Sequence, residues 1–266
     1  MVRAFIAILI LASASQLSWG QSLEDAVNSP ERTAAFQQRD RYRHPTQTLS
    51  FFGLSSEQTV VEIWPGGGWY TEILAPYLKE NGRLYAAHFP VETDIPYFIN
   101  ARNNFSDKLA SSPELYGNVI LAEFDPGASI LSVPEGSADL VLTFRNVHNW
   151  LRNDSEATAF ELFFRALKPG GMLGVVEHRV KEGKSREWML SNGYMTEQTV
   201  MDLASAAGFL LAEKSEINTN AKDSADHPKG VWTLPPSLRL GEAELERYKA
   251  IGESDRMTLL FKKPEH

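Results

Sequence analysis

The sequence predicts an α/β protein built on a doubly wound, mostly parallel sheet of seven strands, with an antiparallel last strand. Short apolar runs of strand length alternate with stretches of helical periodicity, a pattern that requires crossover connections. A glycine-rich turn follows the first of these strands, and the last two runs lack a strong crossover helix between them. The 266 residues, 43% of them hydrophobic, are enough for one well-buried core.

The first twenty residues have the features of an export signal. Arg3 precedes an apolar run at 4–14, and small residues stand at 18 and 20, where a signal peptidase reads. The run is too short to cross a bilayer, and no later segment is apolar for long enough. We therefore expect a signal peptide over 1–20 and an exported, periplasmic protein with no stable membrane span. An uncleaved anchor is the alternative.

The region 21–58 is expected to form an N-terminal helical cap. Ser29 followed by Pro30 is typical of a helix start, and this helix would run toward Tyr42. The His44-Pro45 pair interrupts it, and a second short helix is expected over 46–52.

The sheet is expected to begin with a strand at 60–64, followed by the glycine turn and a helix through Tyr77. A helix is predicted over 154–167, where Lys168-Pro169-Gly170-Gly171 closes it. The next parallel strands are predicted at 83–88, 119–124, 139–144 and 172–177.

The C-terminal part departs from simple alternation. A helix over 196–207 precedes two expected strands, 209–217 and 257–261, which we predict to pair in antiparallel fashion. The segment 218–255 between them is rich in turn residues and has a single helical patch. The region 59–266 is thus expected to be one domain, with 218–255 inserted as a lid.

The turn at Gly66, Gly67 and Gly68 is the first candidate for ligand binding. In a doubly wound sheet, ligands bind outside the carboxyl ends of the strands, beside the turn after the first strand. Glycines let the backbone approach a ligand without intervening Cβ atoms. A tight turn without a ligand would use the same residues.

The motif from Glu62 to Gly68, an acid at a strand end followed by glycines, resembles the first motif of class I S-adenosylmethionine-dependent methyltransferases. The resemblance implies that Glu62 organises the turn and that Gly66 to Gly68 bind the cofactor S-adenosylmethionine. Trp64 stands where the family has its first glycine, so its ring would either crowd the methionine moiety or pack under the turn.

Two further cofactor contacts follow from the same resemblance. His88 ends the second strand, where the family has an acid that binds both ribose hydroxyls, and a neutral imidazole has only one donor and one acceptor. Asp125, just past the third strand, matches an acid that accepts from the adenine amino group. A turn aspartate before Pro126 is the alternative interpretation of Asp125.

The Arg145-Asn146-Val147 run after the fourth strand resembles the quinone-precursor methyltransferases, which implies a small-molecule substrate. A second likeness, over nearly the whole mature chain, is to a group of exported bacterial proteins regarded as methyltransferases. It is carried by Arg39-Asp40, Arg43-His44-Pro45, Phe51-Phe52-Gly53, Trp64-Pro65-Gly66 and the segment 252–257.

Methyl transfer needs an acceptor held in line, and a general base where the acceptor must lose a proton. His148 is the candidate base, and Asn146 the candidate for contacts with both cofactor and acceptor. The loops around the sheet supply five candidate substrate contacts: Arg43, His44, Asn149, Trp150 and His178. Each of these residues could instead be ordinary loop structure. The Asp226-His227-Pro228 segment could fold back as part of the lid.

The composition and the motifs also bear on functions other than methyl transfer. A net charge of −8 excludes the basic stripe of a nucleic-acid binder. The histidines cluster near the predicted loops, but their spacing matches no ligand motif, so no metal site is expected. The main alternative is an exported, non-enzymatic protein with this fold that binds a metabolite or a metal; contiguous glycines make a nicotinamide-dependent reductase the weakest interpretation.

Overall fold

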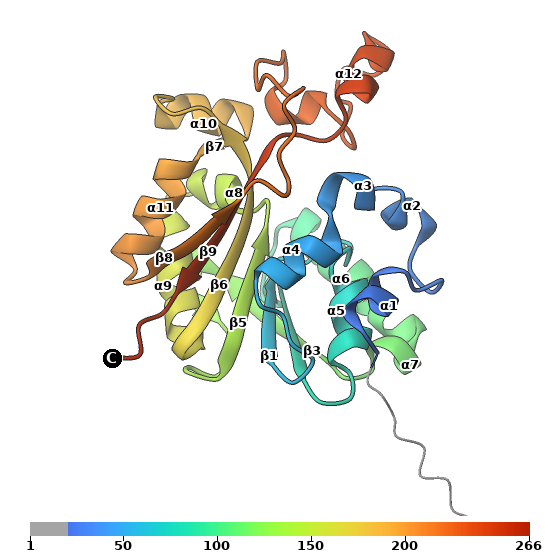
Figure 1. Ribbon diagram of the computed structural model, residues 1–266, viewed down its shortest axis with the longest axis vertical. Helices are drawn as coiled ribbons and strands as arrows, with labels where there is room; N and C mark the ends of the chain where they lie inside the picture. Colours follow the sequence, from blue (N-terminus) through green and yellow to red (C-terminus); the bar gives the residue numbers. More distant parts are fainter. Residues whose placement is uncertain (1–20) are drawn as a thin grey trace, which may run out of the picture.

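The computed structural model describes residues 21–266 (Figure 1). The expected signal peptide, 1–20, lies outside the described residues. Within them, no helix is both long and apolar enough to cross a membrane. A single mixed sheet runs through the molecule in the order β4-β3-β2-β1-β5-β6-β9-β8, and β7 pairs with β6 beside this path.

The sheet is mostly parallel, with antiparallel pairs at both of its edges, which confirms the predicted fold class. β9 (Arg256–Lys262) runs antiparallel to both β6 and β8 (Leu210–Ser215). The parallel strands are β1 (Thr59–Ile63), β2 (Arg83–His88), β3 (Val119–Asp125), β5 (Ala138–Phe144) and β6 (Leu167–Val180).

Residues 21–266 form nine strands rather than the expected seven. The two additional strands, β4 (Ile130–Leu131) and β7 (Met195–Thr196), are two residues long. A two-residue strand has no room for an alternating pattern, so the sequence does not indicate it.

Helices cover both faces of the sheet, because successive strand residues point to opposite sides. Val60, Leu84 and Leu142 pack against α1, α4 and α5, whereas Val61 and Val175 pack against α9 and α11 (Figure 1). The helices of the domain are α5 (Thr71–Leu78), α6 (Pro96–Ser111), α7 (Pro113–Tyr116), α8 (Val147–Leu151), α9 (Glu156–Ala166), α10 (Arg186–Asn192) and α11 (Glu197–Ala206).

Residues 21–58 form four short helices instead of the two that were expected. Ser22, not Ser29, caps the first helix, through a capping box with Asp25. His44 has a left-handed φ of 40° and separates the last two helices. The four helices are α1 (Leu23–Val27), α2 (Ala34–Gln37), α3 (Asp40–Arg43) and α4 (Pro45–Phe51).

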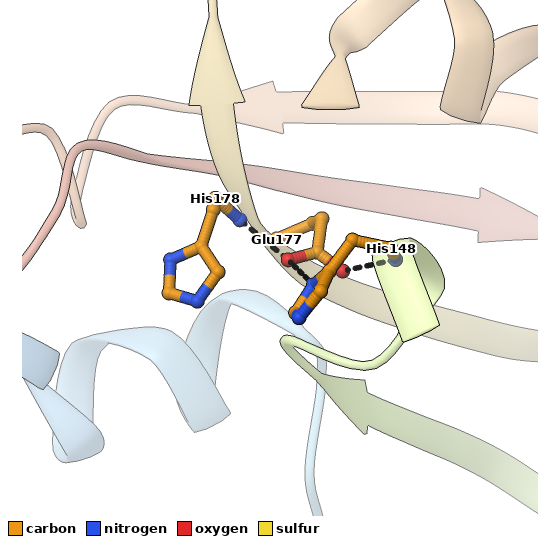
Figure 2. Close-up of side chains that lie close together, drawn as sticks. All are labelled: His148, Glu177 and His178. Carbon is orange, nitrogen blue, oxygen red and sulfur yellow. Dashed lines mark hydrogen bonds and ion pairs between the residues drawn. The ribbon is translucent and has the colours of Figure 1, made fainter. Parts of the chain in front are cut away.

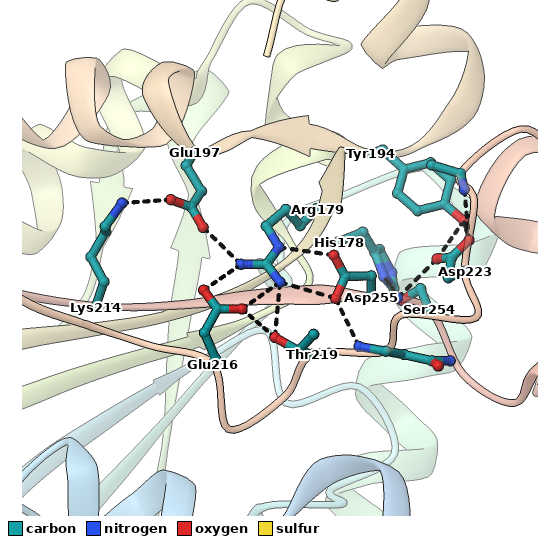
Figure 3. Close-up of polar contacts among 12 residues, drawn as sticks. His178, Arg179, Tyr194, Glu197, Lys214, Glu216, Thr219, Asp223, Ser254 and Asp255 are labelled. Carbon is teal, nitrogen blue, oxygen red and sulfur yellow. Dashed lines mark hydrogen bonds and ion pairs between the residues drawn. The ribbon is translucent and has the colours of Figure 1, made fainter. Parts of the chain in front are cut away.

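The long excursion between β8 and β9 contains η2 (Gly230–Thr233) and α12 (Leu245–Ile251) and lies near α3, beyond the carboxyl end of β6 (Figure 1). Arg179, at the end of β6, anchors it. Its guanidinium bonds to Asp255 at 2.8 Å, Glu216 at 2.7 Å and Glu197 at 2.9 Å (Figure 3). Both ends of the excursion are therefore tied to the sheet.

Candidate functional site

Two adjoining cavities open at the carboxyl ends of the parallel strands. The larger has a volume of about 740 Å³ and the smaller of about 390 Å³. Volumes of this size suit small-molecule ligands. Five residues line both cavities, so the two form one site with two compartments: Trp64, Gly66, Gly67, Asn146 and Asn149.

The glycine turn forms part of the boundary between the cavities. Gly66 has a φ of 59°, and a Cβ built on it would meet no atom within 4 Å. Gly68, with a φ of 83°, lines neither cavity, and a Cβ built on it would lie 3.1 Å from the Phe105 ring. The left-handed φ at both positions favours glycine. Only Gly66 and Gly67 of the three are positioned to touch a ligand.

Glu62 lies under the turn, near the end of β1, and borders the smaller cavity. Its side chain is buried, and Oε2 accepts a 2.6 Å hydrogen bond from the Thr71 hydroxyl at the start of α5. Burial raises the pKa of Glu62 to about 7, while the Thr71 bond and the charge of Lys108 oppose that shift. Glu62 is therefore a group that changes charge near neutral pH.

Trp64, which stands where the resemblance described above would place a glycine, has a left-handed φ of 43°. Its Nε1–H donates to the Phe124 carbonyl at 3.0 Å, and its ring lies 4.8 Å from that of Phe89 and 5.8 Å from that of Trp150. The ring thus packs under the turn against the ends of β2 and β3. Its exposed edge remains a wall of both cavities.

The imidazole of His88 lies against the backbone of the glycine turn. The side chain is fully buried, Nδ1 accepts from the Phe89 N–H at 2.8 Å, and Nε2 lies 3.4 Å from the Gly66 carbonyl oxygen. Burial lowers the pKa of His88 to about 4, so the ring is neutral, with Nε2 as the donor. The expected ribose contact is not met here, because both ring nitrogens are already bonded.

Asp125 ends β3 and caps the short helix η1 (Pro126–Ala128), accepting from the Gly127 N–H at 3.0 Å. This is the turn role that was the alternative interpretation. The residue also borders a recess of about 50 Å³ beside Phe89 and Phe98. The side chain is thus engaged locally but lies next to the larger cavity.

The walls of the larger cavity are mostly aromatic and amide side chains. Helix α6, which the sequence analysis did not predict, supplies many of them, and Pro96 at its first position was the available signal. The lining residues beyond the shared five include Phe89, Tyr97, Phe98, Asn100, Asn104 and Phe105. Flat apolar walls with amides between them suit an aromatic ring that carries polar groups.

Asn146 and Asn149 follow β5 and reach both cavities. Asn146 is mostly buried, and its Nδ2 donates to the Ile63 carbonyl at 2.9 Å, which ties the ends of β1 and β5 together. Trp150 is a correction: it is 1% exposed and packs in the core against Phe124 and Phe163, so it forms no cavity wall. On α8 its side chain faces the core behind the site.

His148 pairs with Glu177 across the ends of β5 and β6 (Figure 2). Its Nδ1 lies 3.1 Å from Glu177 Oε1, and its backbone N–H donates to Oε2 at 3.3 Å. The carboxylate fixes the proton on Nδ1, which leaves Nε2 as an acceptor in the smaller cavity. The expected strand at 172–177 ends at Glu177, but no local pattern identifies this residue as the partner of His148.

His178 follows Glu177 and lines the smaller cavity. Its Nδ1 lies 2.5 Å from the Ser254 hydroxyl oxygen (Figure 3), and burial, followed by the neighbouring His148 and Arg256, holds its pKa well below the usual range. Ligand atoms of His148, Glu177 and His178 lie within 4.8 Å of one another, a grouping that could hold a metal ion. No spacing motif in the sequence indicates this grouping, because the ends of β5 and β6 bring the residues together.

Four arginines also line the smaller cavity: Arg39, Arg43, Arg145 and Arg256. Arg43 was an expected substrate contact. His44 is a correction, since its Nδ1 lies 3.4 Å from Asn218 Oδ1 and the residue borders neither cavity. The left-handed backbone at His44 directs its side chain to the excursion.

The excursion covers the smaller cavity with a wall at 231–237 rather than with the expected Asp226-His227-Pro228 segment. Val231, Trp232 and Ser237 lie along this wall. His227 is buried instead, where its Nε2 lies 2.8 Å from Asp223 Oδ1.

No family model and no curated protein matches the chain. Solved structures do match. An S-adenosylmethionine-dependent methyltransferase from Aquifex aeolicus superposes with a TM-score of 0.57 at 16% identity, over 85% of this chain and 93% of that chain. The chain has the Rossmann-like methyltransferase fold.

Two other structures define how far this likeness extends. Phosphoethanolamine N-methyltransferase 2 from Haemonchus contortus, in complex with S-adenosyl-L-methionine, matches with a TM-score of 0.58 at 16% identity, over 91% of this chain and 60% of that chain. The [4+2]-cyclase SpnF matches with a TM-score of 0.58 at 16% identity, over 92% of each chain. One fold thus hosts different reactions, and the function has to be argued from the site.

Proposed function

We propose that this protein transfers a methyl group from S-adenosylmethionine to a small-molecule acceptor. The observation that carries the proposal is the pair of cavities that meet at Gly66 and Asn146, one walled by aromatic rings and amides and the other holding the His148–Glu177 pair. A two-substrate transfer requires two compartments that share a boundary where the reacting atoms meet.

The larger cavity fits the cofactor in size and in the chemistry of its walls. Phe89 and Phe98 can flank an adenine ring, and the glycine turn admits a ligand close to the backbone. His88 is occupied by the turn, so the amides of Asn100 and Asn104 are the candidates for the ribose hydroxyls. The match to a methyltransferase in complex with S-adenosyl-L-methionine supports this assignment.

When bound, the cofactor supplies an electrophilic methyl carbon on a sulfonium sulfur. His148 Nε2 accepts the proton that the acceptor loses, and Glu177 holds the imidazole in the required tautomer and stabilises its protonated form. Asn146, at the boundary, orients the acceptor, while the wall at 231–237 excludes water.

Titration of S-adenosylhomocysteine into the folded chain 21–266 by calorimetry tests the proposal. Gly66→Val should abolish binding, because its side chain enters the open space between the cavities. Gly136→Val is the matched control, since Gly136 has a φ of 61°, is exposed and also has no atom within 4 Å of a built Cβ. Both substitutions carry the same backbone strain, of at least about 1–2 kcal/mol. Equal affinity in the Gly66 variant and the parent would contradict the placement of the cofactor.

The second candidate is a non-enzymatic binding protein that has kept the fold. The occupied His88 favours it, since the expected ribose acid is missing and the imidazole in its place is already bonded. A folded protein that binds no S-adenosylhomocysteine but does bind a metabolite would support this candidate over methyl transfer.

We also propose that the protein is exported to the periplasm, from the signal features of 1–20 and the likeness to exported bacterial proteins. N-terminal sequencing of the protein purified from its cells is the test. A mature chain that begins at Gln21 is the expected result, and an intact Met1 in the cytoplasmic fraction would contradict it.

A further inference from the structure

The smaller cavity has an excess of buried positive charge that the proposed chemistry does not use. Four guanidinium groups line it, and the Glu253 carboxylate contacts three of them. Glu253 accepts from Arg39 at 2.5 Å, from Arg43 at 3.3 Å and from Arg256, and it is itself 2% exposed. One carboxylate cannot neutralise four cations that lie so close together.

Several of the guanidinium nitrogens have no partner among residues 21–266. Arg43 is 2% exposed, and both of its terminal nitrogens, Nη1 and Nη2, are buried without an acceptor. Nη2 of Arg39 is also buried and has no acceptor. Buried N–H groups of a charged side chain are costly unless an acceptor meets them, and native proteins leave very few unpaired.

Arg145 adds a guanidinium with no hydrogen-bond partner within the described chain. It directly follows β5, its backbone N–H donates to the Val176 carbonyl at 2.7 Å, and its φ is 64°. A left-handed conformation in a residue other than glycine costs energy and is concentrated at functional sites. Here the strained backbone places an arginine at the wall of the cavity.

The arginines also act on one another. Burial lowers the pKa of Arg43, and the next contribution is the charge of Arg145; burial and then Arg256 lower the pKa of Arg145 to about 10. The guanidinium charges of Arg43 and Arg145 therefore lie close to other arginines that line the same cavity. A divalent cation at His148, Glu177 and His178 would meet the same repulsion, which argues against a metal ion there.

We propose that the smaller cavity binds the anionic end of the methyl acceptor, a carboxylate or phosphoryl group held by Arg43 and Arg145. This inference rests on the proposed function and names its substrate class. Guanidinium forks match the paired oxygens of both groups, and such charge-assisted bonds are the strong ones. The acceptor is thus a small organic acid, whose body packs on Trp69, Tyr70 and Trp232 and whose reactive atom faces His148.

The test uses three probes with one common ring: benzoate, phenyl phosphate and the neutral benzamide, each titrated into chain 21–266. Both anions, or one of them, should bind at least about 10-fold more tightly than benzamide. The anion that binds more tightly shows whether the anionic end of the acceptor is a carboxylate or a phosphoryl group. Arg145→Gln should weaken anion binding by roughly 10- to 100-fold, the loss expected for a charge-assisted bond. Because no hydrogen bond of the Arg145 side chain is broken, folding should survive, and circular dichroism checks this.

The matched control is Arg165→Gln. Arg165 is half exposed and pairs with exposed Glu135 at 3.6 Å, away from the cavities, so anion affinity should stay within about 2-fold of the parent. Benzamide binding as tightly as the anions, unchanged affinity in Arg145→Gln, or no anion binding by the folded parent would each overturn the inference. If the protein binds S-adenosylhomocysteine but no anion, the proposed function stands and this inference fails. Anion binding without S-adenosylhomocysteine binding would remove methyl transfer and keep the anion site.

Discussion

Replacing Glu62 with glutamine should stabilise the protein above neutral pH while weakening cofactor binding. The Glu62 carboxyl is buried beneath the glycine turn and has the Thr71 hydroxyl as its hydrogen-bond donor at 2.6 Å. Glutamine has nearly the same shape, and its carbonyl oxygen can accept the same bond. The substitution therefore removes the cost of burying a charge and little else.

The magnitude follows from the pKa of Glu62, which burial raises from 4.5 to about 7. At pH above 4.5 the unfolded chain loses this proton while the folded chain keeps it, so the parent loses stability as pH rises from 4.5 to 7. Above pH 7 both the folded and the unfolded chain have lost this proton, so the loss of stability no longer changes with pH. A difference of about 2.5 pKa units corresponds to about 3 kcal/mol. Glu62→Gln should remove this loss and be more stable than the parent by up to that amount at pH 8, with no difference near pH 4.

Urea denaturation of both proteins at several pH values measures the effect. Glu135→Gln is the control, because Glu135 is exposed and its ion pair with Arg165 contributes little at any pH. A stability difference between Glu62→Gln and the parent that is the same at pH 5 and pH 8 would refute the reasoning. Calorimetry on the same variant should show weaker S-adenosylhomocysteine binding, since the family resemblance assigns Glu62 to the turn and the methionine end.

His148→Ala should lower kcat about 10²- to 10⁴-fold with any acceptor found among small organic acids, because the general base is lost. The Kd for S-adenosylhomocysteine should stay within about 2-fold of the parent value. A variant that is fully active at pH 7 would show that His148 has only a structural role. Glu177→Gln keeps an acceptor for His148 Nδ1 but removes the charge, so it should lower kcat less than His148→Ala does. Arg179→Met removes the shared partner of Asp255, Glu216 and Glu197. Urea denaturation should show a free energy of unfolding lower by about 2 kcal/mol, and the segment 218–255 should be cut faster by proteases. Unchanged stability would show that other contacts hold the excursion.

The fold could be predicted from the sequence because its determinants are local. Apolar runs of five to seven residues in β1 and β5, the glycine turn and the turn residues after α9 each indicate an element by themselves. Helix α6 was missed because it is largely polar and buries only Phe105, so its amphipathic pattern is weak. The same helix provides much of the larger cavity.

The site was predictable only in outline. Position at a strand end placed Asn146, His148 and His178 on the correct edge of the sheet, since parallel strands end together. The partners of these side chains depend on register and rotamers, which no local pattern specifies. His88 and Trp150 turn inward for that reason, and the His148–Glu177 pair appears only once β5 and β6 are aligned.

Of the arginine cluster, the sequence predicted only Arg43 as a substrate contact, and it did not predict that the four arginines meet. Its members come from segments far apart in the chain: α2 to α3, the residue after β5, and the start of β9. No spacing in the sequence relates them. Only the packing of the N-terminal helices and the excursion against the end of the sheet brings their charges together.

The most direct measurement is a crystal structure of chain 21–266 grown with S-adenosylhomocysteine and the tightest-binding organic acid. We predict the adenosine in the larger cavity against Phe98, the sulfur beside Gly66 and Asn146, and the acid in the smaller cavity with its anionic oxygens on Arg145 and its other end toward His148. Adenosine in the arginine-lined cavity, or one ligand that spans both cavities and leaves no room for a second, would contradict a transfer between two compartments.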